Sequence, residues 1–293
     1  MKYLDAVSLA KLRGLKLVLR RFASEGQTSG RHRSALKGFS RDFAQHRPYA
    51  PGDALKDIDW KALARLDKFF VREYAAESML QTQILVDASG SMAFAASGRE
   101  SKYDHAARLA AAMAYLILEQ GDAVGLTVFD TEPRARLSPR ASLAHLEQVD
   151  STLAAAAPRG ETELGRCVER AAAALKRRSL VILISDLLGD PETTARVVRS
   201  LRARRHEVMA LQVLDPRERE LDYHGGPVSF ESLETGERLV CDPDALRVQY
   251  RAELERMLRL YESSFQGSEI RYQLFYTDQP WDKALGRFLS GVR

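Results

Sequence analysis

Short apolar segments alternate with helical segments along most of this 293-residue chain, and this alternation restricts the fold more than any other feature. The apolar segments have the length and composition of strands, and they occupy residues 82–87, 123–130, 179–186, 206–215 and 270–278. Helical patterns lie between or after them, at residues 103–120, 140–157, 163–178, 190–204, 242–265 and 281–289. Because strands joined through helices pair in parallel by right-handed crossovers, the sequence predicts an α/β fold with a doubly wound, mainly parallel sheet.

Two segments depart from this alternation. Residues 22–79 combine a Gly- and Ser-containing loop with a β-rich stretch, and residues 216–241 have the pattern of a hairpin that turns at Thr235 and Gly236. Each β segment is too small to be stable alone, so we expect the two to pair in one small β-rich satellite subdomain. The expected organisation is an N-terminal helix with part of the satellite in residues 1–79, and an α/β domain in residues 80–293 with a β insertion at about 216–241.

Composition indicates a globular chain without a membrane span. Hydrophobic residues make up 45% and charged residues 29%, as in ordinary soluble domains. The longest uninterrupted apolar run, residues 109–118, is far shorter than the ~20 residues that cross a bilayer. The N-terminus lacks the apolar core of a signal peptide, and Cys167 and Cys241 have no metal-site or disulfide spacing. From these features we expect a cytoplasmic protein.

The net charge of +4 is unevenly distributed, because residues 1–41 contain ten Lys or Arg and only two acidic residues. A basic arm of this kind can bind nucleic acid or an acidic membrane surface. The alternative is an amphipathic helix whose apolar residues face inward, namely Leu4, Val7, Leu12, Leu15 and Leu19. No aromatic residues are interleaved with the bases as a stacking platform, so the helix is favoured and nucleic acid is not the expected partner.

Oxygen-bearing side chains gather after two of the predicted buried strands. The stretch "ILVDASGSM" places Asp87, Ser89 and Ser91 directly after one strand, and Asp186 ends another. Thr162 lies in a polar loop that could fold over the same carboxyl edge of the sheet, where ligands bind in α/β folds. An oxygen-only set suits Mg²⁺, with Mn²⁺ or Ca²⁺ as alternatives, and does not suit zinc or copper. The competing interpretation is a helix-capping loop that binds no metal.

This arrangement resembles the metal-ion-dependent adhesion site (MIDAS) of von Willebrand factor A (VWA) domains. The resemblance rests on D-x-S-x-S after the first strand of the domain, a later loop threonine, and an aspartate that ends the fourth strand. It implies that Ser89, Ser91 and Thr162 ligate the cation directly, while Asp87 and Asp186 ligate it or hold waters. It also implies that a carboxylate of a partner protein fills the open coordination position.

The preceding segment resembles a bacterial family defined by domain of unknown function number fifty-eight. The matching positions are Phe43, Arg47, Tyr49, Gly52, Asp53, Ile58, Asp59, Trp60, Ala64 and Arg65, whereas Lys56 stands where the family often has Arg. Members are typically encoded beside MoxR-type AAA+ ATPases. The resemblance therefore implies a partner or adaptor of such an ATPase in chaperone-like assembly or maturation of other proteins. Many relatives carry membrane hairpins ahead of this region, and this chain does not.

Three classes of function remain open from the sequence. The first is a protein-interaction module, without enzymatic activity, whose metal binds an acidic side chain of the ATPase or its client. The second is a metal-dependent hydrolase, which would need a general base, yet no spare Glu or His accompanies the five oxygen donors. His105 is expected to cap a helix or lie on the surface. The third is nucleic-acid binding through the basic arm. An ATPase is excluded, because the chain contains no G-x-x-x-x-G-K-[ST] loop.

Overall fold

The fold comprises two units. The computed structural model describes residues 1–15, 17, 43–50, 58–66, 68–74, 80–96, 98–175, 178–223 and 225–291. Contacts divide the chain into a larger unit, Met1–Leu17 with Gln81–Arg293, and a smaller unit, Val18–Leu80. Within the described residues, none of the helices combines the length and the apolar composition needed to cross a membrane.

A six-stranded sheet with the strand order β10-β7-β6-β3-β4-β5 forms the centre of the larger unit. Its strands are β3 (Gln81–Asp87), β4 (Ala123–Phe129), β5 (Pro133–Arg140), β6 (Leu180–Ser185), β7 (Glu207–Leu214) and β10 (Arg271–Tyr276). All neighbours pair in parallel except the edge strand β5, which runs antiparallel to β4. The predicted α/β class with a doubly wound, mainly parallel sheet is confirmed.

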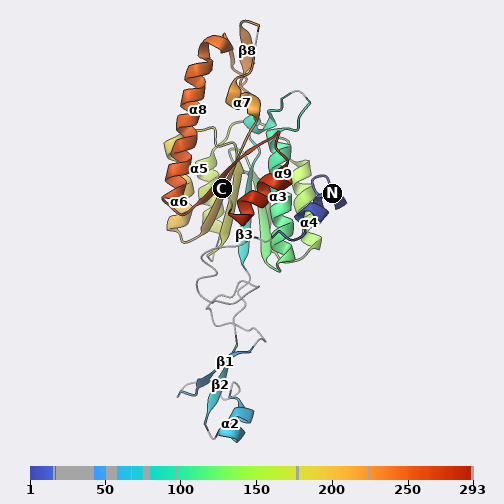
Figure 1. Ribbon diagram of the computed structural model, residues 1–293, viewed down its shortest axis with the longest axis vertical. Helices are drawn as coiled ribbons and strands as arrows, with labels where there is room; N and C mark the ends of the chain where they lie inside the picture. The colour runs from blue at the N-terminus through green and yellow to red at the C-terminus, as the bar shows by residue number, and fades with distance from the viewer. Residues whose placement is uncertain are drawn as a thin grey trace. The chain divides into compact units, whose positions relative to one another are not determined.

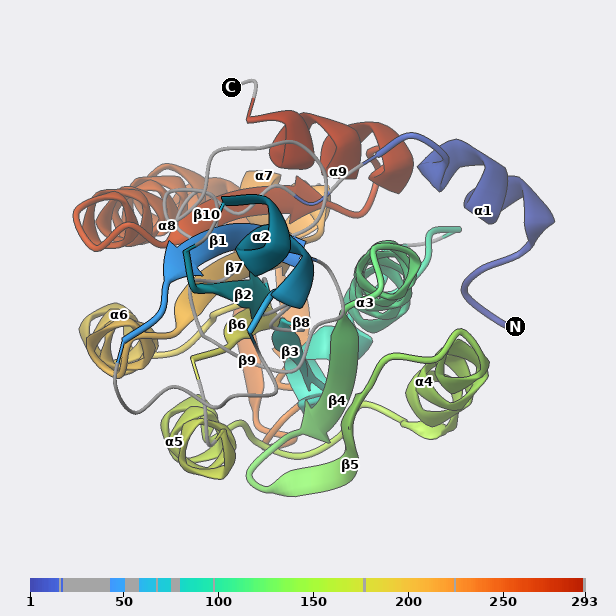
Figure 2. The same ribbon diagram turned by 90° about the horizontal axis from the view of Figure 1, so that it is seen from below.

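Helices cover both faces of this sheet (Figure 2). One face carries α5 (Leu164–Ala174), α6 (Pro191–Ala203) and α8 (Pro243–Gln266), and the other carries α1 (Ala6–Leu12), α3 (Lys102–Glu119), α4 (Ala144–Ala155) and α9 (Trp281–Ser290). The short helix α7 (Pro216–Glu220) follows β7.

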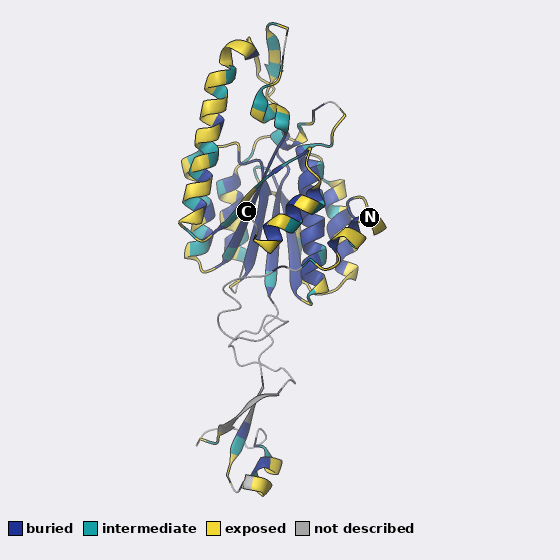
Figure 3. Ribbon diagram, in the orientation of Figure 1, coloured by how far each residue is buried: buried dark blue, intermediate teal, exposed yellow. Residues whose placement is uncertain are grey.

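Burial explains why the apolar runs form the central strands. Every residue of β4 and β6 is buried, and so is every residue of β3 after the first (Figure 3). Helix α3 is also mostly buried. On the α5–α6–α8 face, Tyr261 packs in the core and donates its hydroxyl hydrogen bond to the Leu187 carbonyl at 2.8 Å. This rigid, dry sheet fixes the positions at which its strands end.

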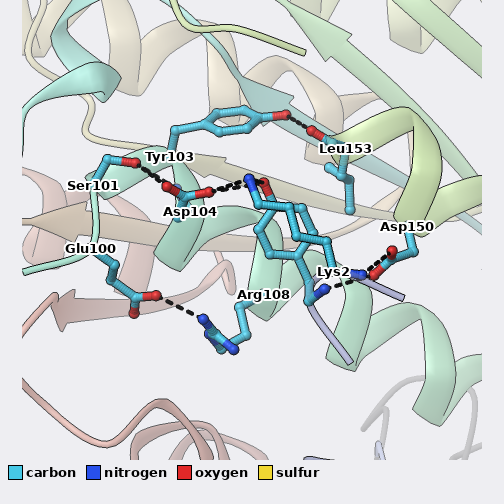
Figure 4. Close-up of polar contacts among 9 residues, drawn as sticks. Lys2, Glu100, Ser101, Tyr103, Asp104, Arg108, Asp150 and Leu153 are labelled. Carbon is cyan, nitrogen blue, oxygen red and sulfur yellow. Dashed lines mark hydrogen bonds and ion pairs between the residues drawn. The ribbon is translucent and has the colours of Figure 1, made fainter. Parts of the chain in front are cut away.

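Polar contacts bind the N-terminal segment to the α3–α4 side of the larger unit (Figure 4). The backbone N–H groups of Lys2 and Tyr3 donate to the two carboxylate oxygens of Asp150, at 2.6 and 2.9 Å. Both side chains also donate to Asp104, each at 2.9 Å. Leu4 is buried, in agreement with the amphipathic-helix interpretation.

The inward face predicted for the N-terminal helix is only partly correct. Leu12 is fully buried and Leu15 half-buried, whereas Val7 is 64% exposed. The helix spans seven residues, so it turns through too few residues to bury every apolar position of the predicted face. Leu19, and the part of the basic arm in residues 18–41, lie outside the described residues.

Strand β5 was not predicted, and the helix expected at 140–157 begins later, as α4 at Ala144. β5 contains two prolines and has an alternating exposure pattern that is partly open to solvent. An edge strand tolerates proline because one of its sides needs no ladder partner. The local pattern lacked the continuous apolar run on which the other strands were predicted.

The two β segments outside the main sheet form separate two-stranded sheets. In the smaller unit, β1 (Phe43–Pro48) pairs with β2 (Phe70–Tyr74), and α2 (Trp60–Leu66) lies between them in sequence. In the larger unit, β8 (Val228–Glu231) pairs with β9 (Arg238–Cys241) as the predicted hairpin. The prediction that these segments share one sheet is wrong, because each finds its antiparallel partner within a few tens of residues.

Residues 1–17 group with the larger unit, and the division into 1–79 and 80–293 stays a prediction.

Candidate metal centre

The parallel pairing of β3 with β6 brings the two predicted aspartates to one edge of the sheet. Val86 is the register partner of Ile184, so Asp87, the last residue of β3, and Asp186, the first residue after β6, lie at almost the same level. Both are buried, with 0% and 1% of their surface exposed. Asp87 accepts hydrogen bonds from the Ser89 N–H at 2.9 Å and from the Ser185 hydroxyl at 2.7 Å.

The loop after β3 folds directly onto this edge. Ser89 and Ser91 have their hydroxyl oxygens 3.2 Å apart, and Ser89 precedes a short 3-10 helix, Gly90–Ala93. A second loop runs alongside it, because the Gly90 N–H donates to the Gly160 carbonyl at 2.7 Å and the Arg159 N–H donates to the Ala88 carbonyl at 3.0 Å. These two backbone hydrogen bonds hold the polar loop that contains Thr162 against the predicted edge of the sheet.

Thr162 is the clearest structural anomaly at this edge. Its hydroxyl oxygen is buried and has no hydrogen-bond partner within the described structure. A buried hydroxyl without a partner is costly, and such groups are rare in folded proteins. A cation bound at this edge would supply the partner that the Thr162 oxygen lacks.

The two aspartates lie close enough to repel one another. Burial, and after it the negative charge of Asp186, raise the pKa of Asp87 to about 7 against the hydrogen bonds that lower it. Burial and a like charge both favour the protonated form. A divalent cation would reverse this balance. The donor set of two carboxylates and three hydroxyls therefore fits a hard cation such as Mg²⁺.

A lysine that the sequence analysis missed lies in the same place. Lys102, fully buried at the start of α3, donates to Asp186 at 2.8 Å and to Glu218 at 2.5 Å. Burial lowers the pKa of Lys102, but the charges of Asp186 and Glu218 outweigh it and the pKa is raised. The ammonium group thus compensates part of the negative charge at the edge.

The turn of the β8–β9 hairpin also reaches this edge and brings a second unpredicted group, Glu234. Burial, with the charges of Asp186 and Glu161, raises the pKa of Glu234 above its ordinary value, although its interactions with the side chain and the backbone of Ser91 lower it. No sequence pattern signalled Lys102 or Glu234, because their approach to this edge depends on the tertiary fold and not on their sequence neighbours.

The structure brings the five predicted ligands to adjoining loops at one edge but gives no dense acidic cluster. Among the residues it describes, no group of three or more His, Cys, Asp or Glu could hold a metal ion. His105, which was expected to cap a helix or lie on the surface, is buried, and its Nδ1 lies 2.8 Å from the Glu100 carboxylate. That carboxylate also pairs with Arg108 (Figure 4).

This sheet topology, with two oxygen-rich loops at its carboxyl edge, defines the larger unit as an α/β domain with a mainly parallel central sheet. The profile of the family described as "Protein of unknown function DUF58" matches residues 45–258, which is more than half of the chain. The chain belongs to this family, as the flanking motif predicted.

Relatives along almost the whole chain are uncharacterized proteins. Rv1480 of Mycobacterium tuberculosis (strain H37Rv) and Mb1516 of Mycobacterium bovis are each 30% identical over 301 residues, covering 99% of this chain and 91% of theirs. Similar solved structures include BatB of Bacteroides thetaiotaomicron (17% identity, TM-score 0.47, 72% of this chain and 98% of that one). They also include the SpRpn10 VWA domain (11% identity, TM-score 0.43, 71% and 94%).

Another similar structure is an aerotolerance-related membrane protein from Bacteroides fragilis (16% identity, TM-score 0.43, 73% of this chain and all of that one). Its description contradicts the cytoplasmic location predicted from composition, and that prediction is wrong. The physical reason is that a globular α/β unit has the same surface composition whether it is free or attached to a membrane. Composition therefore does not determine where such a chain resides.

Proposed function

We propose that this protein is a metal-dependent protein-interaction module, and that it acts with a MoxR-type AAA+ ATPase in the assembly or maturation of other proteins. The proposed ligands of the cation are Asp87, Ser89, Ser91, Thr162 and Asp186, and the proposed cation is Mg²⁺, with Mn²⁺ or Ca²⁺ as alternatives. The observation that carries the proposal is the orphaned, buried hydroxyl of Thr162 on a loop that is bonded to the aspartate loop.

The cation would supply a concentrated positive charge with a coordination position left for an acidic side chain of the ATPase or its client. Asp87 and Asp186 would neutralise part of that charge from within the sheet, and the three hydroxyls would complete the shell from the loops. A carboxylate that meets the cation in a partly dry site makes a stronger contact than in open water. Membership of the DUF58 family and the VWA-like fold support an interaction role.

A hydrolase is the second candidate, and Glu234, an unpredicted carboxylate at this edge with a raised pKa, could act as its base. A hydrolase needs a base that can take a proton from a bound water. The histidine nearest in sequence to the aspartate loop, His105, is already engaged with Glu100. Nucleic-acid binding through the basic arm is a third candidate that the salt dependence of binding tests directly.

Replacement of Thr162 by valine tests the metal centre sharply. Thr162→Val removes an oxygen that has no hydrogen-bond partner among the described residues, so the fold should be retained and Mn²⁺ affinity measured by calorimetry should fall by about tenfold or more. Thr82→Val is the matched control, because the Thr82 hydroxyl is also buried and lacks a partner in the described part of the chain, but lies near the opposite end of β3. Unchanged affinity in Thr162→Val would refute the proposed ligand set.

The same variants test the partnership. Co-purification with the MoxR-type ATPase should require Mg²⁺, disappear in chelator, and be reduced in Asp87→Ala and Thr162→Val but not in Thr82→Val. Recovery that is equal for all variants, with and without chelator, would show that docking does not use the metal.

A further inference from the structure

The smaller unit exposes large aromatic side chains next to the start of its helix. Helix α2 lies beside strand β2 in this unit (Figure 1). Trp60, the first residue of α2, is 57% exposed, and Phe69, directly before β2, is 52% exposed. Side chains of this kind are mostly buried in folded proteins. Exposed aromatic residues that lie close together therefore indicate a contact surface.

Backbone hydrogen bonds bring these aromatic residues to the same end of the unit. The Tyr49 N–H donates to the Phe69 carbonyl at 2.9 Å, and the Asp59 N–H donates to the Phe70 carbonyl at 2.8 Å. These bonds join the end of β1, the start of β2 and the start of α2. The half-buried Tyr49 ring also packs against Phe69, with the ring centroids 6.2 Å apart and the planes tilted by 54°. Tyr49, Trp60 and Phe69 at this end form an aromatic patch.

Exposed cations flank the aromatic patch. Lys61, Arg65 and Lys68 are all exposed, and both lysines directly follow or precede an aromatic residue of the patch in the chain. Among the described side chains of the smaller unit, the one carboxylate is that of Asp59, which accepts from two backbone N–H groups at the start of α2, at 2.9 and 3.2 Å. The whole unit, Val18–Leu80, contains twelve Lys or Arg and eight Asp or Glu, so its net charge of +4 equals that of the entire chain.

Aromatic rings beside cations fit the interface between a lipid bilayer and water. Aromatic side chains such as Trp and Tyr occupy the headgroup level of a membrane, and Lys and Arg are attracted to its anionic lipids. The alternative is a single-stranded nucleic acid, whose successive bases stack on the faces of aromatic rings. The 54° tilt between Tyr49 and Phe69 offers no parallel faces for such stacking, which favours the lipid surface.

We propose that the aromatic patch and its flanking cations dock the smaller unit on a membrane surface that contains anionic lipids. The rings enter the headgroup region, and the cations stay at the level of the lipid phosphates and carboxylates. The docking is reversible, because a few interfacial side chains bind a bilayer far more weakly than a membrane-spanning helix does. It is independent of the proposed metal centre, whose ligands all lie in the larger unit.

Tryptophan fluorescence of the full chain tests the proposal, because Trp60 is exposed and the chain's second tryptophan, Trp281, is only 9% exposed. In chelator, vesicles of phosphatidylcholine mixed with phosphatidylserine should shift the emission to shorter wavelength and protect Trp60 from the aqueous quencher acrylamide. Vesicles of phosphatidylcholine alone should do neither, because they carry no net charge. The shift should be absent in Trp60→Phe, which assigns it to this residue. Wild-type emission that the mixed vesicles leave unchanged would overturn the proposal.

Co-sedimentation with the same mixed vesicles measures the affinity. Trp60→Ala and Phe69→Ala should each weaken binding about tenfold, because each removes a ring from the headgroup region. Lys68→Gln should weaken binding about fivefold through the loss of one charge. Leu239→Ala is the matched control and should bind as wild type does, because Leu239 is 64% exposed but belongs to the larger unit.

Two outcomes would assign the contact elsewhere. Equal binding of the wild type and both aromatic variants would overturn the proposal, and would indicate that other basic residues of the chain attract the lipid. Quenching of Trp60 by a single-stranded oligothymidylate, without any response to the mixed vesicles, would also overturn it and would identify the aromatic patch as a surface for base stacking.

Discussion

At the scale of single residues, Lys102 determines how the charges of the candidate metal centre balance. None of its side chain is exposed, and its ammonium group contacts the carboxylates of Asp186 and Glu218. A buried ion pair is weak support for stability, but removal of one partner leaves an uncompensated charge in the interior. Through Glu218, Lys102 also connects the carboxyl edge of the sheet to α7, the helix that precedes the β8–β9 hairpin in sequence.

Replacement of this lysine should therefore be costly. We expect Lys102→Met to lower the free energy of unfolding by about 3–5 kcal/mol, because the buried carboxylate of Asp186 and the partly buried carboxylate of Glu218 lose their counter-ion. The control is Lys2→Met, whose ion pair with Asp104 involves a lysine that is 54% exposed and should contribute only about 0–1 kcal/mol. Denaturant unfolding measures both. A loss of similar size in the two variants would contradict the role assigned to Lys102.

At the scale of elements, the connections between helices and strands contain buried titratable side chains whose burial the sequence pattern did not predict. His206 lies between α6 and β7, is buried, and accepts a hydrogen bond from the Ser179 N–H at 3.3 Å. Burial lowers the pKa of His206, and the nearby positive charge of Arg204 lowers it further. The histidine is thus neutral in the folded protein at pH values where it becomes charged in the unfolded chain.

This difference predicts a pH dependence of stability. With its folded pKa below the unfolded value of 6.5, His206 costs no stability at high pH. As the pH falls through 6.5 the unfolded chain takes up the proton first, so stability is lost. Melting temperatures measured from about pH 8 to about pH 5.5 should fall less steeply in His206→Gln than in wild type. Parallel curves for the two proteins would refute the assignment.

At the scale of the whole molecule, the distribution of charge allows two modes of association. Residues 1–41 carry an excess of basic residues, ten against two acidic ones, whereas the proposed docking site is a single metal position with buried acidic ligands. Binding to a nucleic-acid backbone releases counterions and depends steeply on salt, while a single contact in a partly dry site does not.

Salt titration separates these modes. Between about 50 mM and about 200 mM salt, the dissociation constant for the ATPase should change only a few-fold in Mg²⁺, because the decisive contact is local. Binding to duplex DNA, measured in parallel, should be weak at the higher salt. A loss of ATPase binding as steep as that of DNA binding would indicate that the basic arm, and not the metal, makes the contact.

The sequence by itself determined the strands, the class of fold and the loops that hold the proposed ligands. Continuous apolar runs are local signals, and residues such as Asp87 and Ser89 follow such a run within three positions. Parallel pairing then places Asp186 beside them, because the carboxyl ends of neighbouring strands share one edge. The edge strand β5 escaped prediction because solvent on one side removes the need for an apolar run.

Only the tertiary structure decided which distant groups complete the site. Lys102 is separated by 84 residues from Asp186 and by 116 from Glu218. Glu234 reaches Ser91 from a hairpin whose own sequence indicates nothing beyond a turn. The physical reason is that burial, like-charge repulsion and backbone contact depend on spatial neighbours, whereas strand and loop propensities depend on adjacent residues.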